Sequence, residues 1–391
     1  MKGLRLYLAP FAPDDSGAAA VLYPLGGLVV ICDAGGCAGN ICGFDEPRWG
    51  QGNKHSAVFS AGLRDMDAIM GRDDKLLAKM QLALKELKAS FAAIIGTPVP
   101  AVIGTDFRAL SRMGKKRLGL PTVTIPTTGT HLYDEGVSAT YLALLKTFAT
   151  PHDSQAASGQ SAAQSTPASQ AQNHPTSSSA TSKQRRILGV WGTTPLELAD
   201  LDTTLLRQVL ATEDWDEIRL YGMDSDLAAY QQAAHNTQNL VYSPSGLAAA
   251  QWLNQQYGTP CEIRCPLTPA EQTILQAVPD TAKNILIIHQ QYKANACRTW
   301  LKERLPHAKI TCATWFMQDK NQCAPQDIHF KEEDDFQQHA KEHHYDIILG
   351  DPAFHRAIPK DNEVTFIDLP HFAVSGDEFI DTKQDTLSQQ S

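Results

Sequence analysis

Short runs of consecutive apolar residues alternate along this chain with longer segments in which apolar residues recur every three or four positions. Runs that are apolar at every position are typical of parallel strands that are buried on both faces. They predict strands at residues 28–32, 91–96, 101–104, 122–126, 187–191, 217–221, 240–243, 284–289, 309–315, 345–350 and 364–368. The pattern therefore predicts an α/β protein with parallel sheets.

The segments between these runs have the spacing of amphipathic helices. In residues 73–88 the large apolar side chains share one helical face, with acidic residues first and lysines last, as the helix dipole favours. Residues 246–256 are predicted to be helical as well. Together the strands and helices predict three consecutive doubly wound α/β units.

Composition separates the first domain from the rest of the chain. Residues 151–183 are almost all Ser, Ala, Gln, Thr, Pro and His, so they cannot build an apolar core and are predicted to be a linker. The predicted organisation is domain I at 1–150, the linker at 151–183, domain II at 184–270, domain III at 271–380 and a disordered tail at 381–391.

Charge and hydropathy exclude several classes of protein. The chain of 391 residues has 34 Lys and Arg against 43 Asp and Glu, a net charge of -9, which argues against nucleic acid as the main partner. No apolar run approaches the roughly 18 residues of a membrane-spanning helix, so no membrane is expected. Pro10 and Pro13 interrupt the stretch that a signal peptide would need, and we predict a cytoplasmic protein.

Three of the eight cysteines are evenly spaced after the first predicted strand. Cys32, Cys37 and Cys42 lie in a glycine-rich segment at the carboxyl end of that strand, where α/β proteins bind ligands. The spacing does not suit a zinc knuckle. Thiolates on this loop could hold an iron-sulfur cluster, which usually needs four ligands, so a second chain would supply the rest. The alternative is that one or two of them are buried apolar residues.

A family resemblance begins at these cysteines. Residues 32–37 (Cys-Asp-Ala-Gly-Gly-Cys) resemble the His-Gly-Pro-x-Gly-Cys element of nitrogenase component 1 type oxidoreductases. Further segments that resemble family elements follow in the family's order, at residues 67–76, 95–106, 128–136, 239–246, 257–260 and 345–350. The order of the segments, more than any one of them, indicates the family.

The resemblance implies three Rossmann-like domains with parallel sheets around a central cleft. It also implies an iron-sulfur cluster at the interface of two homologous subunits, in a homodimer or a heterodimer, and a separate ATP-hydrolysing iron protein as electron donor. The family's first and third cluster cysteines are replaced here by Pro13 and Thr97, and only Cys37 keeps a ligand position. Cys32 stands where the family has His, and Cys42 is an addition, so a four-iron cluster held by Cys32, Cys37 and Cys42 is expected rather than an eight-iron one.

Two functions follow from this resemblance. The first is a subunit of a nitrogenase-like two-component reductase that passes electrons through the cluster to an unidentified substrate. The second is a non-catalytic scaffold or partner subunit for cofactor assembly, which the loss of two family cysteines favours. The sequence has no G-x-x-x-x-G-K-[ST] loop, so ATP should not bind through a P-loop in this chain.

Histidines provide two weaker signals. His339 and His343 fit the H-x-x-E-H zinc pattern, but an acidic run precedes them and a solvated helix face is the simpler interpretation. His371 shares the His-x-x-x-Ser-Gly spacing found where nitrogenase holds its cofactor, although a surface position is the simpler expectation.

Overall fold

Parallel strands form the framework of this protein. The computed structural model describes residues 5–45, 49, 55–151, 185–199, 202–359 and 364–375. The strands are β1 Leu28–Ile31, β2 Ala57–Ser60, β3 Ala92–Ile95, β4 Thr122–Ile125, β5 Ile187–Trp191, β6 Glu217–Leu220, β7 Gln238–Val241, β8 Cys261–Ile263, β9 Asn284–Ile288, β10 Lys309–Thr314, β11 Ile328–His329, β12 Ile347–Gly350 and β13 Thr365–Asp368.

The strands form three separate sheets. The first sheet has the order β2-β1-β3-β4, the second β6-β5-β7-β8 and the third β11-β10-β9-β12-β13. Every strand pairing within them is parallel, for example Leu28 opposite both Ala57 and Ala92. This arrangement confirms the predicted fold class of three parallel α/β sheets.

Helices connect the parallel strands. They are α1 Asp14–Leu22, α2 Gly36–Asn40, α4 Asp65–Met70, α5 Asp73–Ala83, α6 Pro98–Ile103, α7 Phe107–Leu118, α8 Tyr133–Phe148, α9 Thr204–Ala211, α10 Leu227–Gln231, α11 Leu247–Tyr257, α12 Pro269–Gln276, α13 Gln291–Arg304 and α14 Glu333–Glu342. None of the helices in the described part of the chain has the length and apolar character needed to cross a membrane.

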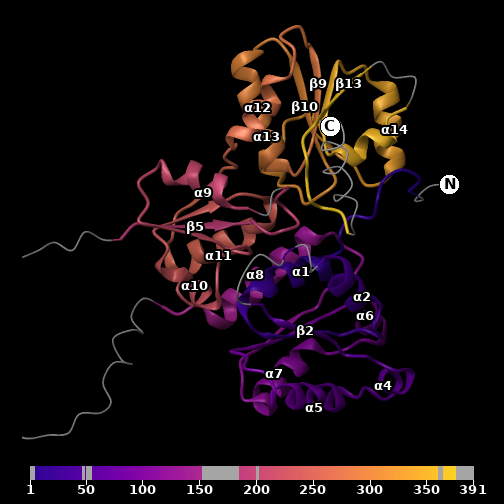
Figure 1. Ribbon diagram of the computed structural model, residues 1–391, viewed down its shortest axis with the longest axis vertical. Coiled ribbons are helices and arrows are strands. Elements are labelled where there is room, and N and C mark those ends of the chain that lie inside the picture. The colour runs from indigo at the N-terminus through magenta and orange to yellow at the C-terminus, as the bar shows by residue number, and fades with distance from the viewer. Residues whose placement is uncertain are drawn as a thin grey trace, which may run out of the picture.

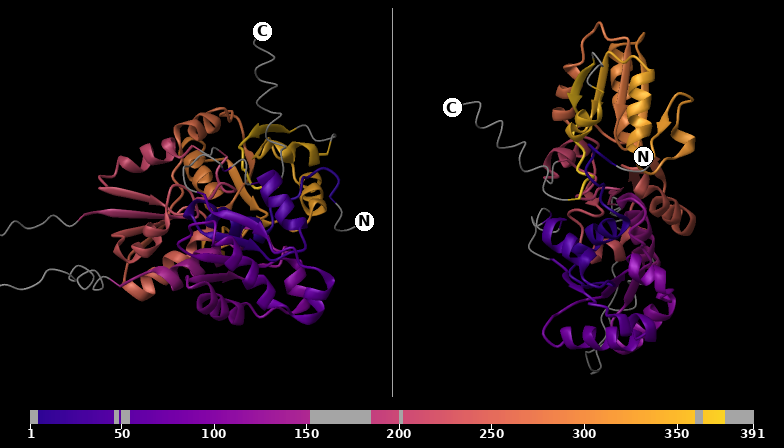
Figure 2. Two further views of the ribbon diagram at one scale, coloured as in Figure 1. Left: turned by 60° about the horizontal axis from the view of Figure 1, so that its bottom comes forward. Right: turned by 90° about the vertical axis from the view of Figure 1, so that its right-hand side faces the viewer.

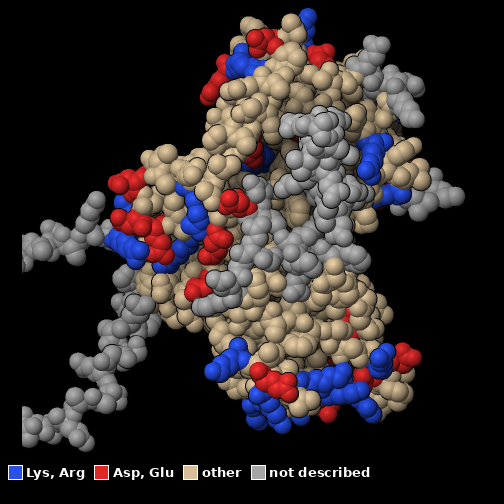
Figure 3. Space-filling model, in the orientation of Figure 1, with Lys and Arg blue, Asp and Glu red and all other residues tan. Residues whose placement is uncertain are grey.

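The first sheet is covered differently on its two faces. Helices α1 and α8 lie between this sheet and the other two sheets, whereas α5 and α7 cover its far side (Figure 1). The third sheet lies at the opposite end of the molecule from the first (Figure 2). Lys and Arg gather along the edge over α5 and α7 (Figure 3), where the last turn of α7 ends in Lys115, Lys116 and Arg117. Helices α1 and α8 therefore pack between the first sheet and the rest of the protein, whereas α5 and α7 have their outer sides in solvent.

Helices α1 and α8 approach until their backbones touch. A Cβ atom at Gly17 would overlap the carbonyl oxygen of Tyr133, and one at Gly136 would overlap the carbonyl oxygen of Asp14. Each helix thus needs a glycine opposite the backbone of the other. The contact explains why all residues of α1 are buried.

One predicted strand is wrong. Residues 101–103 form the end of helix α6, which begins with Pro98 and contains Pro100, and Gly104 caps it. Proline suits the first turn of a helix because its missing N–H has no partner there in any case. Gly104 ends the helix with a φ of 72°, so a short apolar run was mistaken for a strand.

Three short strands were missed. All three, β2, β8 and β11, lie at the edge of their sheet and are only partly buried. β8 contains three residues and β11 only two. An edge strand has fewer buried neighbours, so it does not need a continuous apolar run.

The domain boundaries remain a prediction. The proposed linker at 151–183 lies outside the described residues except for Pro151, and the tail at 381–391 lies wholly outside them. The second sheet begins at Ile187 and the third at Asn284, which is compatible with the predicted domains at 184–270 and 271–380.

The contact between α1 and α8 can be tested by adding one methyl group. Gly17→Ala should lower the free energy of unfolding by about 1–3 kcal/mol, because backbone atoms cannot move aside as a flexible side chain can. Gly39→Ala is the matched control, since a Cβ there meets open space. Urea denaturation of the two variants measures the difference, and equal stabilities would contradict the close contact.

Candidate functional site

The segment after β1 turns sharply into a short helix. Gly35, with a φ of 126°, begins α2, and α2 continues into a π-helical turn, η2 Ile41–Asp45. Asp33 holds the turn in place because one of its oxygens accepts the amide of Ala38 at 2.9 Å and the other accepts the hydroxyl of Ser60 at 2.6 Å. This helix therefore stands at the carboxyl end of β1, where the sequence predicted a site.

Cys37 and Cys42 lie on this short helix and are both half-buried. A π-helical turn has more than 3.6 residues per turn, so residues five apart lie nearer to one face than in an α-helix. The two side chains are partly accessible from outside, as ligands shared with another chain would need to be.

Two residues from distant segments lie beside Cys37. Asp15 from the first turn of α1 and Thr97 at the start of α6 both interact with the Cys37 side chain. Thr97 is fully buried, and its hydroxyl donates to the carbonyl of Cys32 at 2.9 Å. The structure thus brings together the segments in which the resemblance places the family's cluster cysteines.

Sequence analysis missed Asp15. It follows the family ligand position at Pro13 by two residues, and its only signal was a pair of acidic residues at a helix start. Asp14 faces elsewhere, because its carboxylate accepts the amides of Thr128 and Gly129. Only the folded chain shows that Asp15, and not Asp14, lies beside Cys37.

The surroundings of Cys37 keep its thiol protonated. Burial, followed by the negative charge of Asp15, raises the pKa of Cys37 to about 12. Burial and the neighbouring Asp14 raise the pKa of Asp15 to about 6. An acidic, half-buried site disfavours an isolated thiolate, so a positively charged metal would have to replace the thiol proton.

Cys32 lies in a different environment from Cys37. It is buried in the apolar cluster between the first sheet and α5, with Leu28, Leu76 and Met80, whereas Cys37 packs against the cluster on the α1 side. Burial raises the pKa of Cys32 to about 12. Of the three predicted ligands, Cys37 lies on α2 and Cys42 on the π-helical turn that continues it, whereas Cys32 follows β1 and is buried in the other apolar cluster.

The side chains around Cys37 could supply some, but not all, of the ligands that an iron-sulfur cluster needs. Across the described ranges, no group of three His, Cys, Asp or Glu side chains is arranged to hold a metal ion. Asp15 and Thr97 are the two side chains that interact with Cys37, and Thr97 brings a hydroxyl where the resemblance places a family cysteine. These residues can supply a fraction of the ligands, and another chain would have to supply the others.

Comparisons with known proteins decide the family. The sequence matches the family described as "Nitrogenase component 1 type Oxidoreductase" over residues 16–276. The chain belongs to this family. Members bind iron-sulfur clusters and act in multi-subunit complexes with an iron protein. No curated protein matches the sequence.

Solved structures agree on the fold. A structure titled "Nitrogenase Cp1 at pH 6.5" is similar with a TM-score of 0.66 at 10% identity, over 97% of this chain and 89% of that one. A second, "Nitrogenase Cp1 at pH 5", has a TM-score of 0.62 at 12% identity, over 95% and 85%. The likeness extends beyond residue 276, so the third sheet also follows the nitrogenase component 1 fold.

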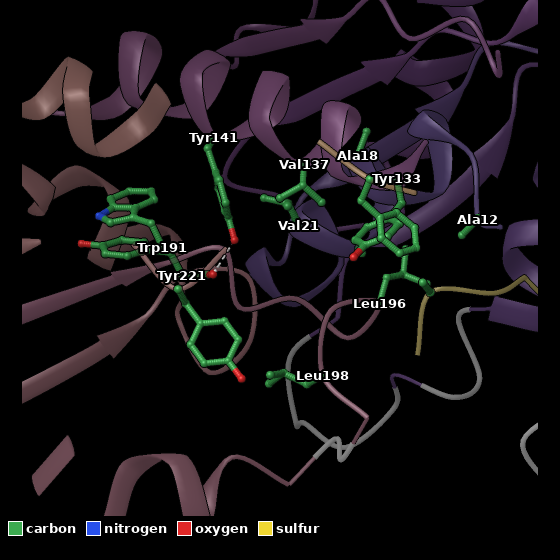
Figure 4. Packing of buried hydrophobic residues seen from close by; sticks show 14 of the residues in the cluster. Ala12, Ala18, Val21, Tyr133, Val137, Tyr141, Trp191, Leu196, Leu198 and Tyr221 are labelled. Carbon is green, nitrogen blue, oxygen red and sulfur yellow. Dashed lines mark hydrogen bonds between the residues drawn. The ribbon is translucent and has the colours of Figure 1, made fainter. Parts of the chain in front are cut away.

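A second polar cluster lies where the three sheets meet. Tyr133 of α8 donates its hydroxyl to Oε2 of Glu197 at 2.8 Å, and the same hydroxyl lies 2.9 Å from Nε2 of His371. Tyr133 follows β4, Glu197 follows β5 and His371 follows β13, so each member lies after a strand of a different sheet. Figure 4 shows Tyr133 beside Leu196, the neighbour of Glu197 in sequence.

His371 is not at the surface, contrary to the expectation from sequence. It is 2% exposed and stacks on His289, with ring centroids 4.4 Å apart. A polar ring can be buried here because Tyr133 supplies a hydrogen-bond partner. His339 on α14 stacks on His343, the residue that follows the helix. Because His339 Nε2 lies 2.7 Å from the hydroxyl of Tyr345, one imidazole of the zinc pattern already has a hydrogen-bond partner.

Cys37 should react slowly with alkylating reagents. Asp15→Asn removes the negative charge beside the thiol, lowers its pKa and should increase its alkylation several-fold at pH 8 in metal-free protein. Mass spectrometry of iodoacetamide-treated protein measures the rate, with the exposed Cys261 as reference in the same digest. If Cys37 of the unaltered chain reacts as fast as Cys261, the proposed environment is wrong.

The buried Glu197 should make stability depend on pH. Burial, the largest cause, raises its pKa to about 8, so between about pH 5 and 8 the folded state holds a proton that the unfolded state has lost. Stability should therefore fall as pH rises through this window, by about 1–2 kcal/mol between pH 6.5 and 8. The buried Asp134 and Asp15 have pKa values of about 6 and contribute mainly below that range.

Glu197→Gln should remove this dependence. Urea denaturation at pH 6.5 and pH 8 should give nearly equal free energies of unfolding for the variant and a clear loss for the unaltered chain. A variant with the same pH slope as the unaltered chain would show that Glu197 is ionised throughout.

Proposed function

We propose that this chain is a subunit of a nitrogenase-like two-component reductase. Family membership supports the general oxidoreductase class. The observation that carries the proposal is the convergence of Asp15, Cys37 and Thr97, from the three segments that hold cluster ligands in the resemblance. A separate ATP-hydrolysing iron protein would supply electrons, because this sequence has no P-loop.

Cys37 and Cys42 would hold an iron-sulfur cluster, with Asp15 as an oxygen ligand. A four-iron cluster is proposed, and when bound it would supply one-electron transfer. Cys32 is the weakest of the three proposed thiolate ligands, because its side chain would have to leave an apolar cluster. The chain's own part is to bury Cys37 against α1 and to exclude water from the inner side of the site.

A partner subunit would complete the site. The helix after Thr97 carries Val102, which is 86% exposed, and the neighbouring α4 carries Ile69, which is 75% exposed. Large apolar side chains exposed together favour contact with another protein. Since α6 begins beside Cys37, a homologous subunit on this side would approach the cysteines, and a twofold contact would present them twice.

A non-catalytic scaffold is the second candidate. Pro13 and Thr97 replace two family cysteines, and the sheet junction is filled by Tyr133, Glu197 and His371. A protein that lost its cluster could keep such a fold for pairing with another subunit. The cytoplasm is the proposed location in both cases, since eight cysteines without a disulfide framework suit a reducing compartment.

Iron analysis of anaerobically purified protein separates the two candidates. The reductase proposal expects iron and sulfide in the unaltered chain, and a loss of at least half of the iron in Cys37→Ala and Cys42→Ala. Cys261→Ala is the control, because this exposed cysteine lies on β8 of the second sheet. Cys32→Ala tests whether the third cysteine contributes.

The oligomeric state is measured on the same samples. If the cluster is shared, iron should elute with a dimer and not with a monomer. Protein without iron or sulfide, before and after anaerobic reconstitution, would support the scaffold. A monomer that carries a full four-iron cluster would contradict a shared site.

A further inference from the structure

The last described residues of the chain return from the third sheet to the first, and we call residues 371–375 the return segment. At its start the amide of His371 donates to a carboxylate oxygen of Asp351, which follows β12, at 2.8 Å. At its end the side-chain amide of Asn40 on α2 donates to the hydroxyl of Ser375 at 2.9 Å. In Figure 1 this part of the chain runs from β13 toward the first sheet. The return segment therefore connects the third sheet to the helix of the cysteine site.

Burial and backbone hydrogen bonds hold the return segment in place. Residues 371–374 are each at most 6% exposed. The segment runs antiparallel to the N-terminal residues, where the amide of Ala12 donates to the carbonyl of Ala373 at 2.8 Å and the amide of Ser375 donates to the carbonyl of Pro10 at 3.1 Å. Ser375 is thus held by its own backbone, and its hydroxyl lies at a fixed point beside α2.

The N-terminal residues that pair with the return segment continue into α1. The carbonyl of Ala12 also accepts the amide of Tyr133 at 2.9 Å, so this part of the chain is fixed to α8 as well. Asp15, in the first turn of α1, interacts with the side chain of Cys37. The return segment thus contacts the chain on both sides of the cysteine site, just before α1 and, through Asn40, at the end of α2.

Helix α2 has little stability of its own. It spans only Gly36–Asn40, and a Cβ at Gly36 or Gly39 would meet open space, so packing requires neither glycine. A helix this short is marginal in water, and glycine makes it more so because it loses the most conformational freedom on folding. Asp33 holds its first turn, and Asn40, its last residue, is bound to the return segment. The geometry of α2 therefore depends on contacts from outside the helix.

Asn40 is well placed to affect both half-buried cysteines. It lies between Cys37 and Cys42 in sequence, at the point where α2 continues into the π-helical turn. Side chains three positions apart are neighbours on a helix surface, so Cys37 and Asn40 share a side of α2. A change in what holds Asn40 should therefore reach both thiols.

We propose that Asn40 and Ser375 are positioning residues of the cysteine site. Their hydrogen bond ties the turn that carries Cys37 and Cys42 to the third sheet and so sets the distance and orientation of the two thiols. The proposal deepens the proposed function and rests on it in one respect, that the thiols hold a metal cluster. The hydrogen bond itself acts on the cysteines whether or not metal is bound.

Alkylation of the metal-free protein tests this positioning. Ser375→Ala removes the acceptor of Asn40 and should raise the rates at which Cys37 and Cys42 react with iodoacetamide at pH 8 by about three-fold or more, because a loosened turn exposes both thiols. Ser375→Thr keeps the hydroxyl and should restore the rates of the unaltered chain. Mass spectrometry of the digest measures each cysteine separately.

Two comparisons separate positioning from a general loss of stability. Ser111→Ala is the matched control, because this hydroxyl on α7 donates to a backbone carbonyl at 2.7 Å on the far side of the first sheet, and its loss should leave the rates at Cys37 and Cys42 unchanged. Cys32, buried in the apolar cluster beside α5, should stay slow in Ser375→Ala. Equal acceleration of Cys32, or unchanged rates at the two half-buried cysteines, would overturn the proposal.

Asn40→Ala, alone and with Ser375→Ala, tests whether the two side chains act as a pair. If they do, the double variant should react no faster than either single variant, because each change removes the same hydrogen bond. Rate increases that multiply in the double variant would refute the pairing.

Failure of the positioning and failure of the proposed function can be distinguished. After anaerobic reconstitution with iron and sulfide, Ser375→Ala should lose iron to a chelator several-fold faster than Ser375→Thr or the unaltered chain. Equal rates of iron loss from loaded protein would overturn the role of the hydrogen bond in holding the cluster. A chain that takes up no iron would contradict the reductase, while the alkylation rates would still decide the positioning.

Discussion

Helices α1 and α8 touch through their backbones, and both the candidate cysteine site and the polar cluster at the sheet junction depend on this contact. Gly17 and Gly136 each lie against the main chain of the other helix, which fixes the two helices relative to each other. The first turn of α1 carries Asp15 to Cys37, and the first turn of α8 carries Tyr133 to Glu197. A small shift between the helices would therefore disturb the cysteine site and the sheet junction together.

Buried carboxylates accept backbone amides from distant segments of the chain, and these hydrogen bonds orient the segments more specifically than apolar packing does. Glu333 on α14 accepts the backbone amides of Leu6, Tyr7 and Leu8, which ties the N-terminal segment to the third sheet. Asp134 accepts the amide of Met317 and so ties α8 to the segment after β10. Each such bond satisfies a charge or an amide that would otherwise be buried without a partner, and the bonds are specific in direction where apolar contacts are not.

The fold could be predicted from sequence wherever a strand is central in its sheet. β1, β3, β5, β9 and β12 each lie between two neighbours and read as continuous apolar runs, because both of their faces are covered. The edge strand β2 escaped because its apolar run, Ala57 to Phe59, is only three residues long and its residues are partly buried or exposed. Residues 101–104 misled because the last turn of α6 and its capping glycine are together as short and as apolar as a strand.

The candidate sites were predictable only in part, for a different reason. Cys37 could be found because its loop is a local sequence feature, but Asp15, Glu197 and the burial of His371 depend on contacts between distant segments. Such contacts give the two regions a shared property, since burial makes Cys37, Asp15 and Glu197 all harder to ionise.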